Sequence, residues 1–106
     1  MLRAADGRPG FYFLEGEVDL THAATVEDLI RATWANGRLA LDLNGLKFID
    51  SAGLRMLSKL HEEFDLALVI SPDAIARRTI EIVSLPELVP IFDSAIDAGL
   101  DDFLAP

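Results

Sequence analysis

The residues best placed for chemistry are Asp50 and Ser51, which lie between an apolar segment and a segment with helical spacing. A serine hydroxyl can act as a nucleophile, and a neighbouring carboxylate or hydroxyl can cap a helix. Gly53 follows within the first turn, where glycine costs a helix about 0.8–1 kcal/mol relative to alanine. A missing side chain there would let another molecule approach the backbone beside Ser51. The junction is therefore either a functional site or a capped helix start.

Sequence motifs for catalysis are absent. The chain has no G-x-x-x-x-G-K-[ST] phosphate loop, no G-x-G-x-x-G fingerprint and no G-x-S-x-G nucleophile elbow. Without cysteine it has no thiol nucleophile, and its two histidines lack metal-ligand spacing. We expect His61 to be a partly buried packing residue and His22 a surface residue. A hydrolase that uses Ser51 with a histidine and an aspartate stays as an alternative from another functional class.

The composition is that of one globular domain. The chain has 106 residues, of which 51% are apolar. A domain of this size buries roughly 60–70% of the surface of its unfolded chain, so it needs no metal or disulfide. No apolar run approaches the roughly 20 residues of a membrane helix, and the polar start MLRAADGRPG is unlike a secretory leader. We therefore expect a single domain over residues 1–106, in the cytoplasm and without membrane insertion.

The charge balance argues against nucleic acid as a partner. Nine Lys+Arg against eighteen Asp+Glu give a formal charge of −9, and residues 79–106 carry six acidic side chains with no Lys or Arg. Phosphate backbones and anionic lipids would be repelled by this end of the chain. A basic protein partner would suit it, although a solvated acidic helix face is the simpler interpretation.

Short apolar segments bounded by turn residues predict four strands. The expected strands cover residues 11–18, 38–43, 66–70 and 88–92. Pro90 would place the last of these at a sheet edge, because proline cannot donate a hydrogen bond to a neighbouring strand. A further apolar run, 46–49, leads from the turn at Asn44 to the Asp50 junction.

Apolar residues with helical spacing predict four helices between and after these strands. They are expected over 22–34, over 51–64, from Pro72 after a Ser71 cap, and from an Asp93 or Ser94 cap to about Leu100. The candidate caps of the first helix are Asp19, Thr21 and Thr25. The expected inner face of the third helix consists of Ile75, Thr79, Ile82 and Val83. Alternating strands and helices predict an α/β fold with a largely parallel sheet.

The segment Asp42-Leu-Asn-Gly-Leu-Lys-Phe-Ile-Asp50-Ser51-Ala-Gly53-Leu54 resembles the signature of the STAS domain, as found in bacterial anti-sigma factor antagonists. Gly16-Glu17-Val18-Asp19, the helix start at Ser71-Pro72-Asp73 and the close from Leu85 to Ala95 resemble other parts of the same family. The resemblance covers nearly the whole chain. It implies a small α/β fold with about four strands, mixed but largely parallel, and helices mainly on one face. The family's first edge strand would be short here, within residues 2–5.

The resemblance implies a binding switch rather than an enzyme. Family members occupy an anti-sigma factor that is also a serine kinase of the histidine-kinase-like ATPase type, and so free a sigma factor. The kinase phosphorylates the serine after the motif aspartate, and a phosphatase resets the switch. In this chain the serine is Ser51 and the aspartate is Asp50. ATP and magnesium would belong to the kinase, so no cofactor is expected on this chain.

The expected docking surface lies around the helix start at Ser51. It comprises Asp19, Thr21, His22, Asn44, Lys47, Asp50, Ser51, Gly53 and Arg55. Ala52 stands where members often have serine or threonine, which leaves one hydroxyl at the site. Arg55 stands where many have a small residue, which could alter the fit to a partner. The alternatives within the family are an accessory subunit of an ABC lipid transporter ATPase and a component of a stress-signalling scaffold.

Overall fold

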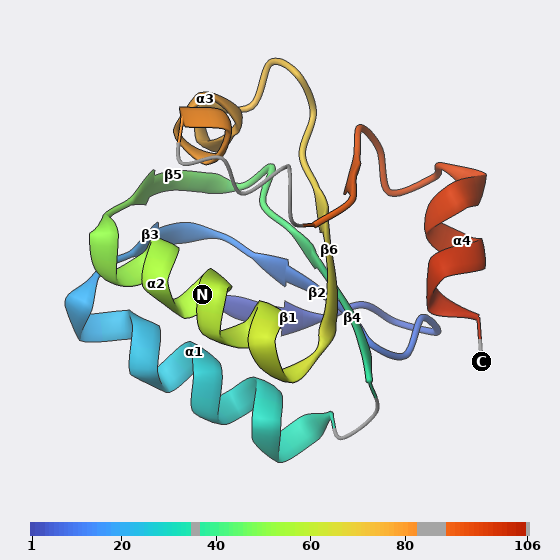
Figure 1. The fold of residues 1–106 in the computed structure, drawn as a ribbon, viewed down its shortest axis with the longest axis horizontal. Helices are drawn as coiled ribbons and strands as arrows, with labels where there is room; N and C mark the ends of the chain where they lie inside the picture. Colours follow the sequence, from blue (N-terminus) through green and yellow to red (C-terminus); the bar gives the residue numbers. More distant parts are fainter. Residues whose placement is uncertain (35–36, 83–88, 106) are drawn as a thin grey trace.

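The computed structural model describes residues 1–34, 37–82 and 89–105. This part of the chain forms seven strands and four helices (Figure 1). The strands are β1 (Leu2–Ala4), β2 (Phe11–Leu14), β3 (Gly16–Val18), β4 (Arg38–Asp42), β5 (Leu46–Ile49), β6 (Asp65–Val69) and β7 (Ile91–Phe92). The helices are α1 (Leu20–Thr33), α2 (Ser51–Glu63), α3 (Ile75–Ile82) and α4 (Ala98–Leu104).

The main sheet has five strands in the order β1-β2-β4-β6-β7. Among the described strands of this sheet only the β1–β2 pair is antiparallel, so the sheet is mixed and largely parallel, as predicted, with one strand more than the expected four. The short first strand forms one edge. The two residues of β7 form the other edge, where Pro90 predicted the last strand to lie. Position 88, the expected start of that strand, lies outside the described residues.

The predicted strand 11–18 is divided into two strands that belong to different sheets. Gly16 has a φ of +83°, a conformation that glycine adopts without steric cost, and its N–H donates to Gly45 O across 2.9 Å. The chain therefore leaves the main sheet after Leu14, and β3 pairs in parallel with β5 as a separate two-stranded sheet. The alternation of residue types continues through residues 11–18, so the sequence pattern gave no sign of the break at Gly16. Because β3 leads into α1 and β5 leads into α2, this small sheet positions both helix starts.

The apolar core lies on both faces of the main sheet. The larger cluster includes Ile30 of α1, Leu57 of α2 and Ile80 of α3, all fully buried against the sheet. On the opposite face, Leu100 of α4 packs with Phe11 and other residues of the central strands. Figure 1 shows α4 standing apart from the other helices, across the sheet from α1 and α2. The helices therefore cover mainly one face, as expected, and α4 covers the other.

The first two helices begin and end close to the predicted positions. α1 starts at Leu20, two residues earlier than expected, because Asp19 caps it. α2 spans Ser51–Glu63, within one residue of the prediction. No helix in the described ranges is long and apolar enough to cross a membrane.

The predicted start of the third helix is wrong. Residues 71–74 form a turn, in which the Ser71 hydroxyl accepts the Asp73 N–H across 3.3 Å, and α3 begins only at Ile75. Ala76 and Ile80 face the core, whereas Ile75 is 68% exposed and so is not part of the inner face. Thr79 is half-buried. The side chains of residues 82 and 83 lie outside the description.

The last helix also begins later than predicted. Asp97, rather than Asp93 or Ser94, caps α4 by accepting the Gly99 N–H across 2.8 Å. The Ser94 hydroxyl instead accepts the Ile96 N–H across 3.2 Å in the turn before the helix. Both residue types favour helix starts and turns for the same reason, since their side-chain oxygens satisfy nearby amides.

Candidate functional site

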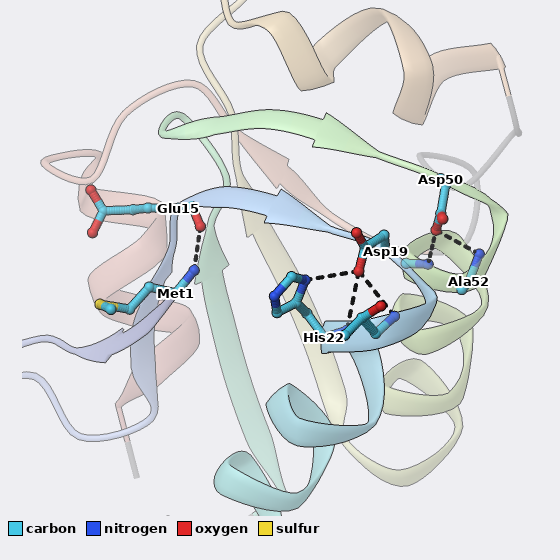
Figure 2. A network of polar contacts seen from close by, with 8 residues as sticks. Met1, Glu15, Asp19, His22, Asp50 and Ala52 are labelled. Carbon is cyan, nitrogen blue, oxygen red and sulfur yellow. Dashed lines mark hydrogen bonds and ion pairs between the residues drawn. The ribbon is translucent and has the colours of Figure 1, made fainter.

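The starts of α1 and α2 lie side by side at the end of the β3–β5 sheet. Val18 and Ile49 are partners in the parallel register, and the Asp50 N–H donates to Val18 O across 3.3 Å. Figure 2 shows Asp19 and Asp50 on neighbouring helix ends. Each helix presents the positive end of its dipole here. The two starts thus form one surface that can receive a partner.

Asp50, and not Ser51, caps α2. Its Oδ1 atom accepts the N–H groups of Ala52 at 2.9 Å and Gly53 at 3.0 Å (Figure 2). Ser51 is the first residue of the helix and is exposed to solvent. Because the carboxylate satisfies the amides, the serine hydroxyl is not required as the cap. Its exposure leaves it accessible to a modifying enzyme.

Asp19 repeats this arrangement at the start of α1. Its Oδ1 accepts the N–H groups of Thr21 and His22 at 3.0 and 3.2 Å, and lies 2.8 Å from the His22 Nδ1 atom. Desolvation acts to raise the pKa of the Asp19 carboxyl, but the hydrogen bonds from His22 and Thr21 outweigh it and lower this pKa. Asp19 is therefore ionised at neutral pH. Thr21 and His22 are exposed, as predicted for His22.

Gly53 has a different role from the one expected. It is buried, and a Cβ atom there would lie 2.5 Å from Ile49 Cγ1 and 2.8 Å from Val18 O. The missing side chain lets α2 pack closely onto the ends of β3 and β5 rather than admitting another molecule. The expectation that a partner approaches the backbone at Gly53 is therefore wrong.

The remaining expected docking residues are not all close to Ser51. Lys47 on β5 and Arg55, one turn into α2, are both exposed. Asn44 lies beyond the opposite end of β5, a strand of four residues and therefore about 13 Å long. Its Oδ1 accepts the Ser71 N–H across 2.7 Å, which ties together two turns of the fold. Asn44 is thus separated from the surface at the helix starts.

Two exposed apolar side chains near the helix starts were missed by the sequence interpretation. Leu20, the first residue of α1, is 78% exposed, and Phe48 of β5 is 51% exposed. Phe48 lies opposite the exposed Glu17 in the β3–β5 register. The run 46–49 was interpreted only as a further apolar run, although alternation along a strand places every second residue on the outer face. These two residues add apolar area to the surface around Asp19 and Asp50.

The geometry does not assemble Ser51 with a histidine base. His61 lies ten residues along the same helix, about 15 Å away, and is partly buried as predicted. Its Nδ1 atom is buried without a hydrogen-bond partner within the described part of the chain. The His22 ring points toward Met1, on the far side of Asp19 from Asp50 (Figure 2). Among the residues with described positions, no cluster of three His, Cys, Asp or Glu side chains could hold a metal ion.

The STAS domain family model matches residues 3–98, which is most of the chain. The chain belongs to the STAS domain family. RsfB, an anti-sigma-F factor antagonist of Mycobacterium tuberculosis, is 31% identical over 88 residues, covering 78% of this chain and 72% of RsfB. The match includes both helix starts described above, since they lie within residues 3–98.

Solved structures of similar proteins share the whole fold. A crystal structure of an anti-sigma factor antagonist from Mycobacterium paratuberculosis has a TM-score of 0.73 and 26% identity, covering 99% of this chain and 92% of that one. The antagonist SpoIIAA in its unphosphorylated form has a TM-score of 0.66 at 16% identity, covering 96% and 94%. A putative antagonist from Thermotoga maritima has a TM-score of 0.75 at 16% identity, covering 99% and 94%. The last two show the shared STAS fold.

Proposed function

We propose that this STAS domain protein is an anti-sigma factor antagonist that phosphorylation of Ser51 switches off. In this function the unmodified protein binds an anti-sigma factor and thereby frees a sigma factor. The observation that carries the proposal is the exposure of Ser51 as the first residue of α2, beside a cap supplied by Asp50. The relatives named as anti-sigma factor antagonists support the same function.

The fold can accept a phosphate at Ser51 without rearranging. A phosphate adds about −1.5 to −2 charges at pH 7. At the start of a helix this charge meets the positive end of the dipole, an interaction worth about 0.3–1 kcal/mol and up to 2. The Asp50 cap keeps its own hydrogen bonds to Ala52 and Gly53, because the modified oxygen belongs to a different side chain. The modification therefore leaves the domain folded.

A docked partner would meet the phosphate differently. Bringing an acidic group of the partner within 4 Å of one added charge costs about 1 kcal/mol in water and about 4 kcal/mol at an effective dielectric of 20. Desolvating the phosphate adds to this cost. A loss of about 3–4 kcal/mol weakens binding by two to three decades. Phosphorylation would thus control association while the fold stays intact.

The proposal assigns the chemistry of the switch to other proteins. The partner is an anti-sigma factor that is also a serine kinase of the histidine-kinase-like ATPase type, and ATP with magnesium binds to that kinase. A phosphatase resets Ser51. Because sigma factors act on RNA polymerase, the proposal places the protein in the cytoplasm.

The test uses three variants and the purified anti-sigma factor kinase of the source organism. Ser51→Asp should bind that kinase a hundredfold or more weaker than the unmodified protein, with an unchanged melting temperature. Ser51→Ala should bind but take no phosphate from labelled ATP. Ser58→Asp is the matched control, because Ser58 is exposed on the same helix two turns further along. It should bind like the unmodified protein.

Three results would count against the switch. They are unfolding of Ser51→Asp, equal weakening by Ser58→Asp, and phosphate transfer to Ser51→Ala. If the unmodified protein fails to bind the kinase, the antagonist function itself is wrong.

A further inference from the structure

An apolar groove of about 490 Å³ runs between the first strand and the first helix. Leu2 of β1 and Val26 and Leu29 of α1 supply its apolar lining, and Thr25 and His22 lie along the helix side. Leu29 is 47% exposed and Thr25 is exposed, so the groove opens to solvent. We call it the β1–α1 groove. The proposed switch at Ser51 does not involve this groove.

The β1–α1 groove is continuous with the surface at the helix starts. His22 belongs to both, because its ring lines the groove while its Nδ1 atom lies 2.8 Å from the Asp19 carboxylate. Figure 2 shows the His22 ring directed toward Met1, another lining residue, with Asp19 and then Asp50 on its other side. A protein docked over Asp19 and Ser51 therefore reaches the groove without crossing another element.

Two acidic side chains lie at the β1–α1 groove. Glu17 lines it, and Asp19 lies at the end nearer Ser51, where its carboxylate contacts the lining residue His22. The chain as a whole carries a formal charge of −9. A second copy of this protein would bring the same acidic rim against this one, and like charges across an interface are unfavourable. A partner with basic groups is complementary.

We propose that the β1–α1 groove receives an apolar side chain of the anti-sigma factor, flanked in that protein by lysine or arginine. This inference rests on the proposed antagonist function and extends its docking surface along α1. The apolar side chain displaces water from Val26 and Leu29, and the flanking cations pair with Glu17 and Asp19. Association then depends on the groove as well as on Ser51.

The test measures affinity for the purified anti-sigma factor kinase of the source organism. Leu29→Glu places a charge in the groove and should weaken binding about tenfold or more, since burying one large aliphatic side chain contributes roughly that factor. Thr25→Glu is a second variant at an exposed position that supplies nothing to the core. Ile96→Glu is the matched control, because Ile96 is 89% exposed and lies before α4, on the other side of the sheet. It should bind normally, and all three should melt like the unmodified protein.

The outcomes separate the groove from the switch. Normal binding by both Leu29→Glu and Thr25→Glu would overturn the groove proposal even if Ser51→Asp weakens binding. Weakened binding by these groove variants, with normal binding by Ser51→Asp, would support the groove proposal and contradict the Ser51 switch. Light scattering that finds a dimer in the unmodified protein and a monomer in Leu29→Glu would assign the groove to a second copy and refute the proposal. If the unmodified protein does not bind the kinase, both proposals fail.

Discussion

The Asp50 N–H group donates to the Val18 carbonyl oxygen across 3.3 Å. Asp50 is the cap of α2, and Val18 directly precedes Asp19, the cap of α1. This contact joins the end of β5 to the end of β3, and so sets the distance between the starts of α1 and α2. Two carboxylate caps, Asp19 and Asp50, consequently lie on one surface although they are 31 positions apart in the sequence.

Replacing the Asp50 cap should lower stability. Asp50→Ala removes the acceptor of the Ala52 and Gly53 amides, and the loss of a capping side chain costs about 0.5–2 kcal/mol. Asp50→Ser keeps an acceptor oxygen and should lose less. Asp28→Ala, at an exposed position inside α1, is the control and should lose nothing. Urea denaturation measures all three, and equal stability of Asp50→Ala and the unmodified protein would contradict the capping role.

Adding one methyl group at Gly53 should destabilise the protein. Alanine is the better helix former by about 0.8–1 kcal/mol, yet its Cβ would lie 2.5 Å from Ile49 Cγ1 and 2.8 Å from Val18 O. Overpacking of this kind typically costs about 1–3 kcal/mol. Gly37→Ala is the control, because no atom of the described residues lies within 4 Å of a Cβ atom there. Thermal and urea unfolding should separate the two variants. A stabilised Gly53→Ala would mean that α2 is not packed this closely.

The ion pair between α1 and α2 should make stability depend on pH. Arg31 reaches Glu63 of α2 across 2.5 Å and Glu27 of its own helix across 3.1 Å. The hydrogen bond from Arg31 lowers the pKa of the Glu63 carboxyl below its ordinary value of 4.5. A lowered pKa in the folded state means stability that is present above pH 4.5 and is lost as the pH falls through the folded-state value.

Glu63→Gln should therefore be less stable than the unmodified protein at pH 7, and the difference should disappear on acidification below the folded-state pKa. Glu62→Gln, a change at the exposed neighbouring position, is the control and should show no such dependence. Urea denaturation at a series of pH values measures the difference. A constant difference from pH 7 to pH 3 would rule out the ion pair as its source.

The ionised Asp42 carboxylate should lower the free energy of unfolding at neutral pH. Only 6% of this residue is exposed, and burial raises the pKa of its carboxyl above 3.8, although the Asn44 N–H donates to it across 2.9 Å. A raised folded-state pKa means that stability falls as the pH rises through 3.8 and through the folded-state value. Asp42→Asn keeps an acceptor for Asn44 and should be more stable than the unmodified protein at pH 7, but not below pH 3.8.

Asp65→Asn is the control for this prediction, because Asp65 is exposed at the start of the neighbouring strand. The free energy of unfolding from urea curves at pH 3 and pH 7 provides the comparison. A less stable Asp42→Asn at pH 7 would show that the hydrogen bond to the charged carboxylate outweighs the burial.

Local features of the sequence were enough to predict the central elements and the junction at Ser51. The spacing of apolar residues defined α2 to within one residue, since an amphipathic helix has to keep its apolar side chains on one face. Asp19 and Asp50 were among the predicted candidate caps, because a capping aspartate acts on amides only two or three residues away. The family signature around Asp50 and Ser51 likewise consists of neighbouring residues.

Contacts between distant residues could be seen only in the tertiary structure. The break at Gly16 and the role of Gly53 depend on what Gly45 and Ile49 contact in space. The β1–α1 groove is formed by side chains from separate strands and a helix. The sequence by itself determined the elements and the position of the serine, because propensity, capping and apolar periodicity act over a few residues. Only the tertiary structure decided which elements share a surface, because that depends on strand pairing and close packing between segments far apart in the chain.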